Sequence, residues 1–283
     1  MMNRRHFVRL SAGAAAGGLL GLEHVSFLAK AEAAQSSLDR IGVQLYTVRT
    51  LLENDFEGTM AAVADIGFHE VEFHDYFGRE PQQVRELLTD LGLDAPASHF
   101  PSESLRDDPE GVIETALAIG HRYVILAWLP PEDRASIDQY ADLAAFCNRM
   151  GKLAKSAGLR FAFHNHDFDL YPIEGTVPFD LLISETDPDL VDFELDLFWT
   201  TKAGHDPLDY FESHPGRFPL CHVKDMAEDQ NMVEVGGGGI DFASIFAASN
   251  RAGLEYYFVE HDEPADPLAS IRSSFEYLQT LRY

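Results

Sequence analysis

The feature that most constrains the fold is a strict alternation of short apolar runs with longer segments of helical periodicity, which begins near residue 37. The short runs have the length and composition of buried strands, and the longer segments repeat apolar residues every three to four positions. The eight runs cover residues 41–46, 70–74, 93–100, 123–129, 159–166, 190–196, 218–225 and 256–262. The clearest helical segments cover residues 56–67, 81–92, 108–120, 136–158, 177–186 and 266–281.

Strands that alternate with helices in this way are parallel and are connected by right-handed crossovers. Eight strand–helix units in one chain are typical of a TIM barrel. A doubly wound sheet, the competing arrangement, usually has a glycine-rich phosphate loop after its first strand, and no such loop follows Tyr46. The sequence therefore predicts an α/β fold, a single (β/α)8 TIM barrel over residues 37–283.

Polar side chains gather at the carboxyl ends of the eight runs, which is where TIM-barrel enzymes carry their active sites. Six of the 12 histidines lie there, namely His74, His99, His164, His166, His222 and His261. In the fifth run, the apolar residues Phe161 and Phe163 lead directly into His164, Asn165 and His166. We therefore expect the strand ends to form one polar cup at the mouth of the barrel.

Four consecutive runs, the fifth to the eighth, each offer a side chain that can bind a metal ion. These are His164, Asp196, His222 and Glu260. Adjacent strands lie about 4.8 Å apart, so donors at neighbouring strand ends can meet at one ion with bonds of about 2.0–2.2 Å. Two imidazoles and two carboxylates suit Mn²⁺, Zn²⁺, Co²⁺ or Fe²⁺. The sequence predicts one such divalent ion, with His166 or Lys224 as a donor to its carboxylate ligands.

Several motifs at the strand ends carry a resemblance to a known family. They are FHNHDFD (163–169), FELDLFW (193–199), CHVKD (221–225), VGGGGIDF (235–242) and FVEHD (258–262). With these motifs the chain resembles the sugar phosphate isomerase/epimerase superfamily, the xylose-isomerase-like barrels, over essentially all of residues 37–283.

The resemblance implies one divalent metal held by strands five to eight, commonly through Glu, Asp, His and Glu. Asp196, His222 and Glu260 match the last three positions, and His164 stands at the first. Relatives with an H-N-H motif carry a Glu where this chain has Asp169, so Asp169 is the alternative first ligand.

A divalent ion chelated by the carbonyl and a hydroxyl of a sugar acidifies the adjacent C–H and stabilises an enediolate. We therefore expect a metal-dependent isomerase or epimerase of an unphosphorylated keto-sugar, because no basic cluster for a phosphate is present. Glu260 is the first candidate for the base, and His164, His166 and Lys224 are further catalytic candidates. The same groups suit β-elimination, so a dehydratase or a lyase of keto-sugars or 3-keto-glycosides is the alternative.

The remaining strand-end residues are expected to bind the sugar. Trp128 and Trp199 offer flat apolar faces to a sugar ring, and Gln44, Glu72 and His99 offer contacts to hydroxyl groups. The four glycines at positions 236–239 are expected to form a flexible loop near the barrel mouth.

The charge balance limits the classes of partner. The chain has 21 Lys and Arg residues against 47 Asp and Glu residues, a formal net charge of −26. Such a surface repels phosphate backbones, which argues against a nucleic-acid partner and against a DNA endonuclease on this barrel. The alternative that is not an enzyme is a non-catalytic periplasmic sugar-binding protein. The presence of Asp196, His222 and Glu260 together argues against it. A small-molecule sugar is the expected partner, and the sequence leaves open whether the protein forms a homo-oligomer.

Residues 1–33 have the pattern of a twin-arginine signal peptide. Arg4 and Arg5 precede Phe7, and a small-residue, mildly apolar stretch follows that is too short and rich in glycine to span a bilayer stably. Two A-x-A cleavage motifs follow at residues 29–31 and 31–33. The sequence thus predicts export to the periplasm without stable membrane insertion. Cys147 and Cys221 form no C-x-x-C motif and are expected to be buried thiols.

Overall fold

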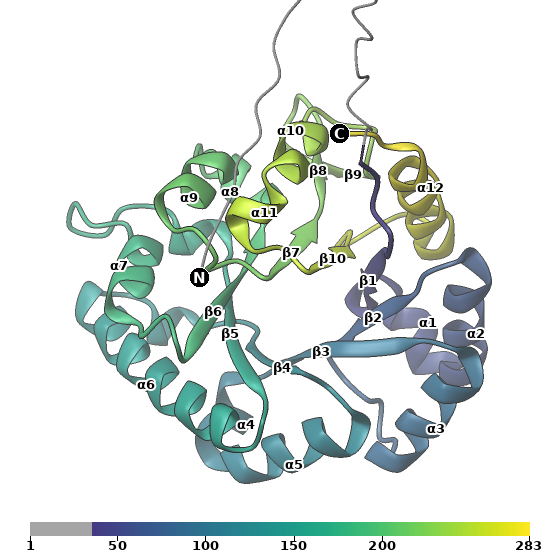
Figure 1. Ribbon diagram of the computed structural model, residues 1–283, viewed down its shortest axis with the longest axis horizontal. Coiled ribbons are helices and arrows are strands. Elements are labelled where there is room, and N and C mark those ends of the chain that lie inside the picture. Colours follow the sequence, from purple (N-terminus) through teal and green to yellow (C-terminus); the bar gives the residue numbers. More distant parts are fainter. Residues whose placement is uncertain (1–35) are drawn as a thin grey trace, which may run out of the picture. The chain divides into compact units, whose positions relative to one another are not determined.

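The computed structural model describes residues 36–283, which form a closed barrel of eight parallel strands with helices around it (Figure 1). The barrel strands are β1 (Gly42–Gln44), β2 (Glu70–Phe73), β3 (Asp94–Phe100), β4 (Tyr123–Leu126), β5 (Arg160–His164), β6 (Val191–Asp196), β7 (Leu220–Val223) and β10 (Tyr256–Val259). They follow the order β1-β10-β7-β6-β5-β4-β3-β2, and each neighbouring pair is parallel. The predicted (β/α)8 TIM barrel is therefore confirmed.

The longer helices lie where the sequence predicts them. In the described part of the chain the helices are α1 (Arg49–Asn54), α2 (Phe56–Ile66), α3 (Pro81–Leu91), α4 (Ser102–Asp107), α5 (Pro109–Ile119), α6 (Ile137–Ser156), α7 (Pro178–Glu185), α8 (Leu197–Lys202), α9 (Pro207–Ser213), α10 (Phe242–Ala247), α11 (Ser249–Ala252) and α12 (Pro267–Thr280). Local capping explains several starts: the side chains of Ser136 and Gln139 form a capping box at α6, and Asp266 caps α12.

The barrel interior changes from apolar to polar along the strands. Its apolar part is Ala97, Tyr123, Ile125, Ala162, Leu220, Tyr256 and Phe258. Residues two positions apart on a strand face the same side. The residues two positions after Ala97, Ala162, Leu220 and Phe258 are His99, His164, His222 and Glu260, so the apolar filling gives way to ionisable groups at the carboxyl ends of the strands.

A short hairpin follows β7 at the mouth of the barrel. It consists of β8 (Asp225–Met226) and β9 (Met232–Val233), and the glycine run comes next. The buried carboxylate of Asp225 accepts hydrogen bonds at 2.8–3.1 Å from the backbone N–H groups of Met226, Gly236, Gly238 and Ile240. The loop that the sequence predicted to be flexible is therefore held around one side chain.

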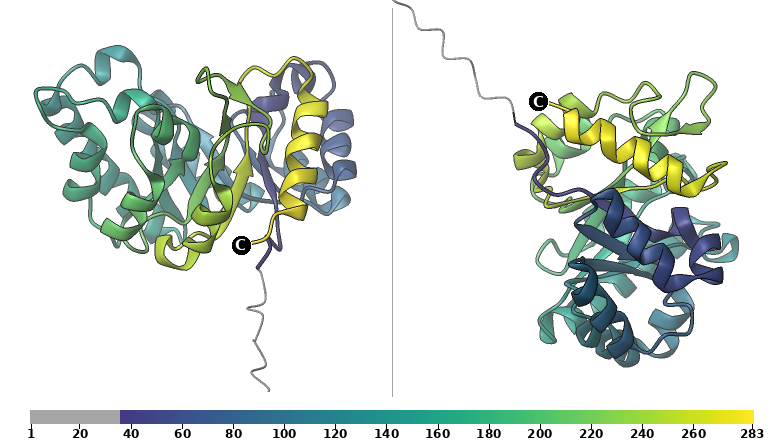
Figure 2. Two further views of the ribbon diagram at one scale, coloured as in Figure 1. Left: turned by 90° about the horizontal axis from the view of Figure 1, so that it is seen from above. Right: turned by 90° about the vertical axis from the view of Figure 1, so that its right-hand side faces the viewer.

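The two described ends of the chain meet at the opposite end of the barrel (Figure 2). The backbone N–H of Ser36 donates to the carbonyl of Tyr283 at 2.7 Å, and the N–H of Tyr283 donates to the carbonyl of Ser36 at 3.1 Å. The predicted signal peptide, residues 1–33, lies outside the described residues.

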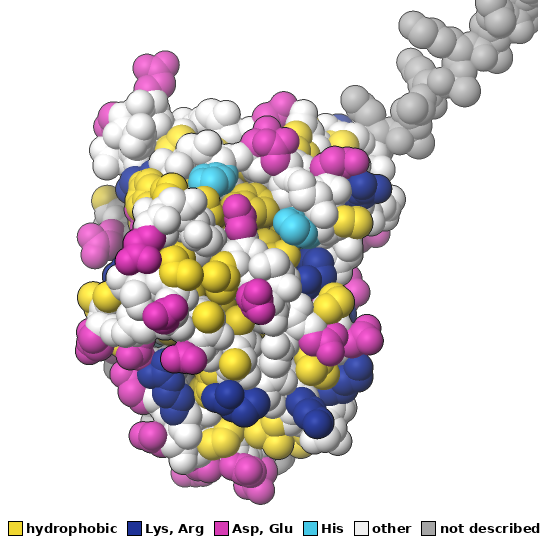
Figure 3. All heavy atoms as spheres, turned by 90° about the vertical axis from the view of Figure 1, so that its left-hand side faces the viewer, with side chains coloured by type: hydrophobic (Ala, Val, Ile, Leu, Met, Phe, Trp, Pro, Cys, Tyr) yellow, Lys and Arg dark blue, Asp and Glu magenta, His cyan; other side chains and the backbone are white. Residues whose placement is uncertain are grey.

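Carboxylates are spread over the face shown in Figure 3, where several Lys and Arg side chains form a row in the lower part and others lie apart from it. Within residues 36–283, no helix combines the length and apolar character that crossing a bilayer requires. Cys147 and Cys221 are buried free thiols, as predicted.

Candidate metal centre and active site

A cavity of about 500 Å³ opens at the carboxyl ends of the strands, a volume typical of small-molecule sites. Six residues that the sequence proposed for the site line it: His99, Trp128, His164, His166, Lys224 and Glu260. His74, which the sequence placed in the polar cup at the barrel mouth, also lines it, as do Tyr46 and Asp262, for which the sequence indicated no site role. The polar groups form the floor and Trp128 is half exposed at the side, so the cavity combines charged and apolar walls.

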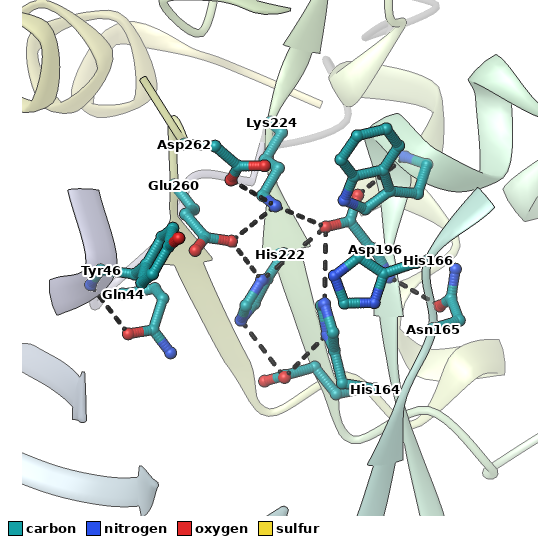
Figure 4. Close-up of polar contacts among 12 residues, drawn as sticks. Gln44, Tyr46, His164, Asn165, His166, Asp196, His222, Lys224, Glu260 and Asp262 are labelled. Carbon is teal, nitrogen blue, oxygen red and sulfur yellow. Dashed lines mark hydrogen bonds and ion pairs between the residues drawn. The ribbon is translucent and has the colours of Figure 1, made fainter. Parts of the chain in front are cut away.

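The end of β5 positions the end of β6 through the residue between the two histidines of the H-N-H motif. The side-chain oxygen of Asn165 accepts a hydrogen bond from the backbone N–H of Asp196 at 3.0 Å (Figure 4). Asp196 also caps α8, because its Oδ1 accepts from the N–H of Trp199 at 2.8 Å. These two bonds leave the buried Oδ2 of Asp196 turned toward the cluster of ionisable side chains, where Lys224 Nζ lies 3.0 Å from it.

Three of the four predicted metal ligands meet at the cavity floor. His222 Nδ1 lies 2.7 Å from Glu260 Oε2 and 3.8 Å from Asp196 Oδ2. His164 approaches the same group with Nε2, which lies 3.8 Å from Asp196 Oδ2. Both His222 Nδ1 and Asp196 Oδ2 are buried, and their nearest charged neighbours are Glu260 at 2.7 Å and Lys224 at 3.0 Å. This set of donor atoms, two carboxylate oxygens and two imidazole nitrogens, fits a divalent ion of the zinc or manganese type.

Asp169, the alternative first ligand, points elsewhere. Its Oδ1 accepts from the hydroxyl of Tyr140 at 2.7 Å, and its Oδ2 accepts from the backbone N–H of His166 at 2.8 Å. Asp169 therefore fixes the turn after β5 and does not join the ligand cluster.

Lys224 forms the cationic part of the floor. Its ammonium nitrogen lies 2.7 Å from Glu260 Oε2, 2.9 Å from Asp262 Oδ1 and 3.0 Å from Asp196 Oδ2. The side chain is almost completely buried, yet its ammonium reaches the cavity (Figure 4). A buried charge of this kind is tolerated only where opposite charges surround it, as three carboxylates do here.

Burial and neighbouring charges set the protonation states at this floor. Burial lowers the pKa of His164 to about 3 and lowers the pKa of His166 well below its usual range. Burial would also lower the pKa of Lys224, but the surrounding carboxylates raise it well above its usual range. Burial would raise the pKa of Glu260, but Lys224 lowers it well below its usual range. At neutral pH the floor thus offers two neutral imidazoles beside a carboxylate–ammonium pair.

A second polar layer lies beneath the ligands, inside the barrel. Glu72 and Glu194 are fully buried there, and His99 Nε2 lies 2.7 Å from Glu194 Oε2. Glu72 accepts a hydrogen bond from the amide of Gln44 at 2.7 Å. Gln44 and Glu72, which the sequence proposed for sugar binding, therefore contact other buried side chains and do not line the cavity.

The two tryptophans proposed for sugar binding differ in their position relative to the cavity. Trp128 lines the cavity, whereas Trp199 does not. The Trp199 ring lies against His166, with 5.9 Å between ring centroids, and the Lys224 ammonium lies 5.6 Å from it. Trp199 thus packs behind two residues of the floor. Glu194 was given no site role from the sequence, although its two-residue spacing from Asp196 puts both side chains on one face of the strand.

A closed (β/α)8 barrel with two imidazoles and two carboxylates at its mouth defines a class of metal-binding TIM barrels. Residues 60–281 match the model of the family described as "Xylose isomerase-like TIM barrel". The chain belongs to this family.

Individual relatives are more distant. The chain is 28% identical over 158 residues to an inosose dehydratase of Lacticaseibacillus casei, a match that covers 50% of this chain and 51% of that protein. It is 24% identical over 267 residues to an inosose dehydratase of Geobacillus kaustophilus, which covers 78% of this chain and 86% of the relative. The chain therefore spans only about half the length of the first of these curated relatives.

A crystal structure of a sugar phosphate isomerase/epimerase from Parabacteroides distasonis has the same fold. It superposes with a TM-score of 0.73 at 25% sequence identity, over 91% of this chain and 98% of that one.

Proposed function

We propose that the protein is a divalent-metal-dependent dehydratase or lyase that acts on an unphosphorylated keto-sugar or keto-polyol. The observation that carries this proposal is the 2.7 Å contact between Glu260 Oε2 and Lys224 Nζ at the floor of the cavity. It joins a carboxylate, which can take a proton from carbon, to an ammonium, which can give one to a departing oxygen. The similarity to inosose dehydratases supports the same reaction class.

The elimination can be written with the residues of this chain. The Glu260 carboxylate takes the proton from the carbon next to the substrate carbonyl, and the C–H electron pair moves toward that carbonyl. The bond from the β-carbon to its hydroxyl or alkoxy oxygen then breaks, and Lys224 supplies the proton that this oxygen needs to leave as water or alcohol. Glu260 returns the proton to Lys224 across their 2.7 Å contact, so both groups regain their starting states.

Asp196, His222, Glu260 and His164 would hold the divalent ion. The chemistry that such an ion supplies when bound is polarisation of the substrate carbonyl and stabilisation of the negative charge that develops on its oxygen. His99, which reaches the cavity from β3, and His166 are placed to hydrogen-bond sugar hydroxyls. Trp128 offers the apolar face for the ring.

Isomerisation or epimerisation is the second candidate, and the position of His166 favours it. His166 lines the cavity from the β5 side, whereas Glu260 lies at the end of β10 (Figure 4). A neutral imidazole on one side and a carboxylate on the other can take a proton from one face of a sugar and return one to the opposite face. The likeness to the Parabacteroides distasonis isomerase/epimerase is in line with this reaction.

Proton NMR in D₂O with the metal-loaded protein separates these reactions. The substrates to test are a keto-inositol, several hexuloses and 3-keto-glycosides. We expect release of water or of the aglycone with formation of an enone, and we expect Lys224→Met to retain C–H exchange while losing this release. Deuterium uptake into an intact sugar would instead identify an isomerase or epimerase. Binding without exchange or release would point to a non-catalytic sugar-binding protein.

We also propose that residues 1–33 direct export by the twin-arginine route, so that the barrel works in the periplasm. The paired arginines followed by a short apolar stretch support this location. This route carries folded proteins, which suits an enzyme that takes up its metal before export.

A further inference from the structure

The two histidines of the metal centre are each contacted from below by a buried carboxylate. His222 directs Nδ1 to Asp196 and Glu260, while its Nε2 lies 2.7 Å from Glu72 Oε2. His164 directs Nε2 toward Asp196, while its Nδ1 lies 3.1 Å from Glu194 Oε2. Each ring therefore uses one nitrogen toward the cavity floor and the other toward the inner layer of the barrel.

We propose that Glu72 and Glu194 are positioning residues that hold the imidazoles of His222 and His164 in the orientation required for metal binding. This inference rests on the proposed metal dependence. The proposal assigns a role to two carboxylates that touch neither the cavity nor the expected ion.

The hydrogen bond of Glu72 decides which nitrogen of His222 can bind a metal. A neutral imidazole carries a hydrogen on one nitrogen and a lone pair on the other. When the ring is neutral, as metal binding at Nδ1 requires, the Glu72 carboxylate 2.7 Å from Nε2 can accept the hydrogen on that nitrogen, and the lone pair is then on Nδ1, the atom that faces Asp196 and Glu260. Carboxylates behind a metal-bound histidine commonly fix both its tautomer and the plane of its ring.

Glu72 is itself held from β1. The amide nitrogen of Gln44 donates to Glu72 Oε2 at 2.7 Å, and the amide oxygen of Gln44 accepts from the backbone N–H of Tyr46 at 3.0 Å. A chain of hydrogen bonds thus runs from the backbone after β1 to the ring of His222. Because the first link is a backbone group, the ring is tied to the frame of the barrel.

Glu194 has the corresponding position beneath His164. It is fully buried, and its Oε2 also accepts from His99 Nε2 at 2.7 Å and lies 3.2 Å from His222 Nε2. Three imidazoles therefore surround one carboxylate oxygen. Apolar side chains fill the interior one step further down the strands, and burying two carboxylates above them costs stability that apolar residues would not cost.

The inner layer has one competing explanation, which is a second metal ion. Donor atoms of His99, His164, Glu194 and His222 lie within 4.8 Å of one another. However, His164 and His222 would then have to bind two ions with both ring nitrogens at once. Metal stoichiometry and the variant Asp196→Ala together distinguish the explanations, since positioning requires one ion per chain that is lost when Asp196 is replaced, whereas an ion in the inner layer would not depend on Asp196.

The test compares metal binding by the full chain and by the variants Glu72→Gln and Glu194→Gln, with Zn²⁺ in a chelator competition and Co²⁺ for its absorption spectrum. We expect one ion per chain throughout, a Kd weakened roughly 10- to 100-fold in both variants and a changed Co²⁺ spectrum. A purely structural role would lower the unfolding temperature of the metal-free protein and leave the Kd unchanged.

The same strands provide matched controls. Glu70 and Asp192 lie two residues before Glu72 and Glu194, are also buried, and pair with Arg40 and Arg160 at 2.7 and 2.6 Å. Glu70→Gln and Asp192→Asn should leave the Kd for Zn²⁺ unchanged.

Unchanged Kd values in Glu72→Gln and Glu194→Gln, or two ions in the wild type, would overturn the positioning role. If one variant does not fold, the other carries the test, because each acts on a different histidine. A wild-type chain that binds no ion would contradict the proposed function as well as this inference. Normal binding in Glu72→Gln and Glu194→Gln, together with loss of the ion in Asp196→Ala, would contradict this inference alone.

Discussion

Asn165 and Asp196 are joined by a 3.0 Å hydrogen bond from the backbone N–H of Asp196 to the side-chain oxygen of Asn165. Asn165 lies between the two histidines of the H-N-H motif, so the motif combines two groups at the cavity with one that fixes the neighbouring strand. The position of the proposed metal ligand at the end of β6 thus depends on the residue that follows β5, which does not itself line the cavity.

Replacing Asn165 with Ala should reduce both stability and metal affinity. The buried backbone N–H of Asp196 would lose its partner, which costs about 1–3 kcal/mol. Asn148→Ala is the matched control, because Asn148 accepts from the backbone N–H of Asp187 at 2.7 Å far from the site. We expect chemical unfolding to show a loss in both variants and Zn²⁺ titration to show weaker binding in Asn165→Ala alone. Equal affinity in the two variants would count against the coupling of β5 to β6.

His222→Ala should remove a metal ligand without removing the proposed base. Metal content after dialysis should fall and turnover should be lost, and a high metal concentration should restore part of the activity. His205→Ala serves as control, since His205 contacts the carbonyl of Leu170 outside the ligand cluster. Elemental analysis that finds full occupancy in His222→Ala would exclude His222 as a ligand.

Glu260→Gln keeps the shape of the side chain and an oxygen donor but removes the base. Activity should fall by roughly 10²–10⁴-fold, the usual contribution of general acid–base catalysis, and added metal should not restore it. Glu263→Gln, at an exposed position three residues later, should behave as the wild type. Near-normal turnover with bound metal in Glu260→Gln would show that Glu260 is not the base, and the proton transfer would then be assigned to His164, His166 or Lys224.

His121 should make the folded state sensitive to acid. Burial lowers its pKa from 6.5 to about 4 in the folded chain, where Nδ1 lies 2.7 Å from the carbonyl of Ala95. Between these two values the unfolded chain binds a proton that the folded chain excludes, so stability is complete above pH 6.5 and falls as the pH falls toward 4. The loss amounts to about 3 kcal/mol at most.

Urea unfolding of the metal-free protein across this pH range measures the effect. His121→Gln should show a shallower dependence on pH than the wild type. Tyr76→Phe, which removes the hydroxyl 2.9 Å from His121 Nε2 but keeps the imidazole, should retain the steep dependence. Parallel curves for the wild type and His121→Gln would assign the acid sensitivity to other groups.

Changing Arg4 and Arg5 together to Lys should keep the protein in the cytoplasm if residues 1–33 act as a twin-arginine signal. Cell fractionation with antibody detection measures the distribution. The same double change at Arg282 and Arg272, near the other end of the chain, controls for the altered side chains. Normal arrival of the Arg4 and Arg5 variant in the periplasm would refute the export proposal.

The barrel was predictable because each strand is an apolar run and each long helix carries its own start and stop residues. The set of ionisable strand-end residues was predictable for the same reason. Their depth along the barrel was not predictable. Alternation tells which face Glu72 occupies, but the tilt of the strands decides how far along the barrel axis its side chain lies. Gln44 and Glu72 were therefore expected at the sugar, although they lie in the layer beneath it.

The glycine run shows a second limit. Four glycines in a row predict freedom of the backbone, and only the fold reveals that Asp225 accepts hydrogen bonds from Gly236 and Gly238. The donors and their acceptor are separated by more than ten residues, so no local pattern connects them. Short helices such as α8 and α9 were missed because six or seven residues hold too few apolar repeats to show a period.

The reciprocal hydrogen bonds between Ser36 and Tyr283 have a consequence for engineering. A short linker between these residues would turn the barrel into a covalent ring that can be opened at another surface turn, which is the arrangement that circular permutation requires. Both junctions lie at the far end from the cavity, so a fusion partner or a surface tether attached there would leave the mouth open to substrate. A barrel made of residues 36–283 can therefore be immobilised or linked in tandem at Ser36 or Tyr283 without obstructing its own entrance.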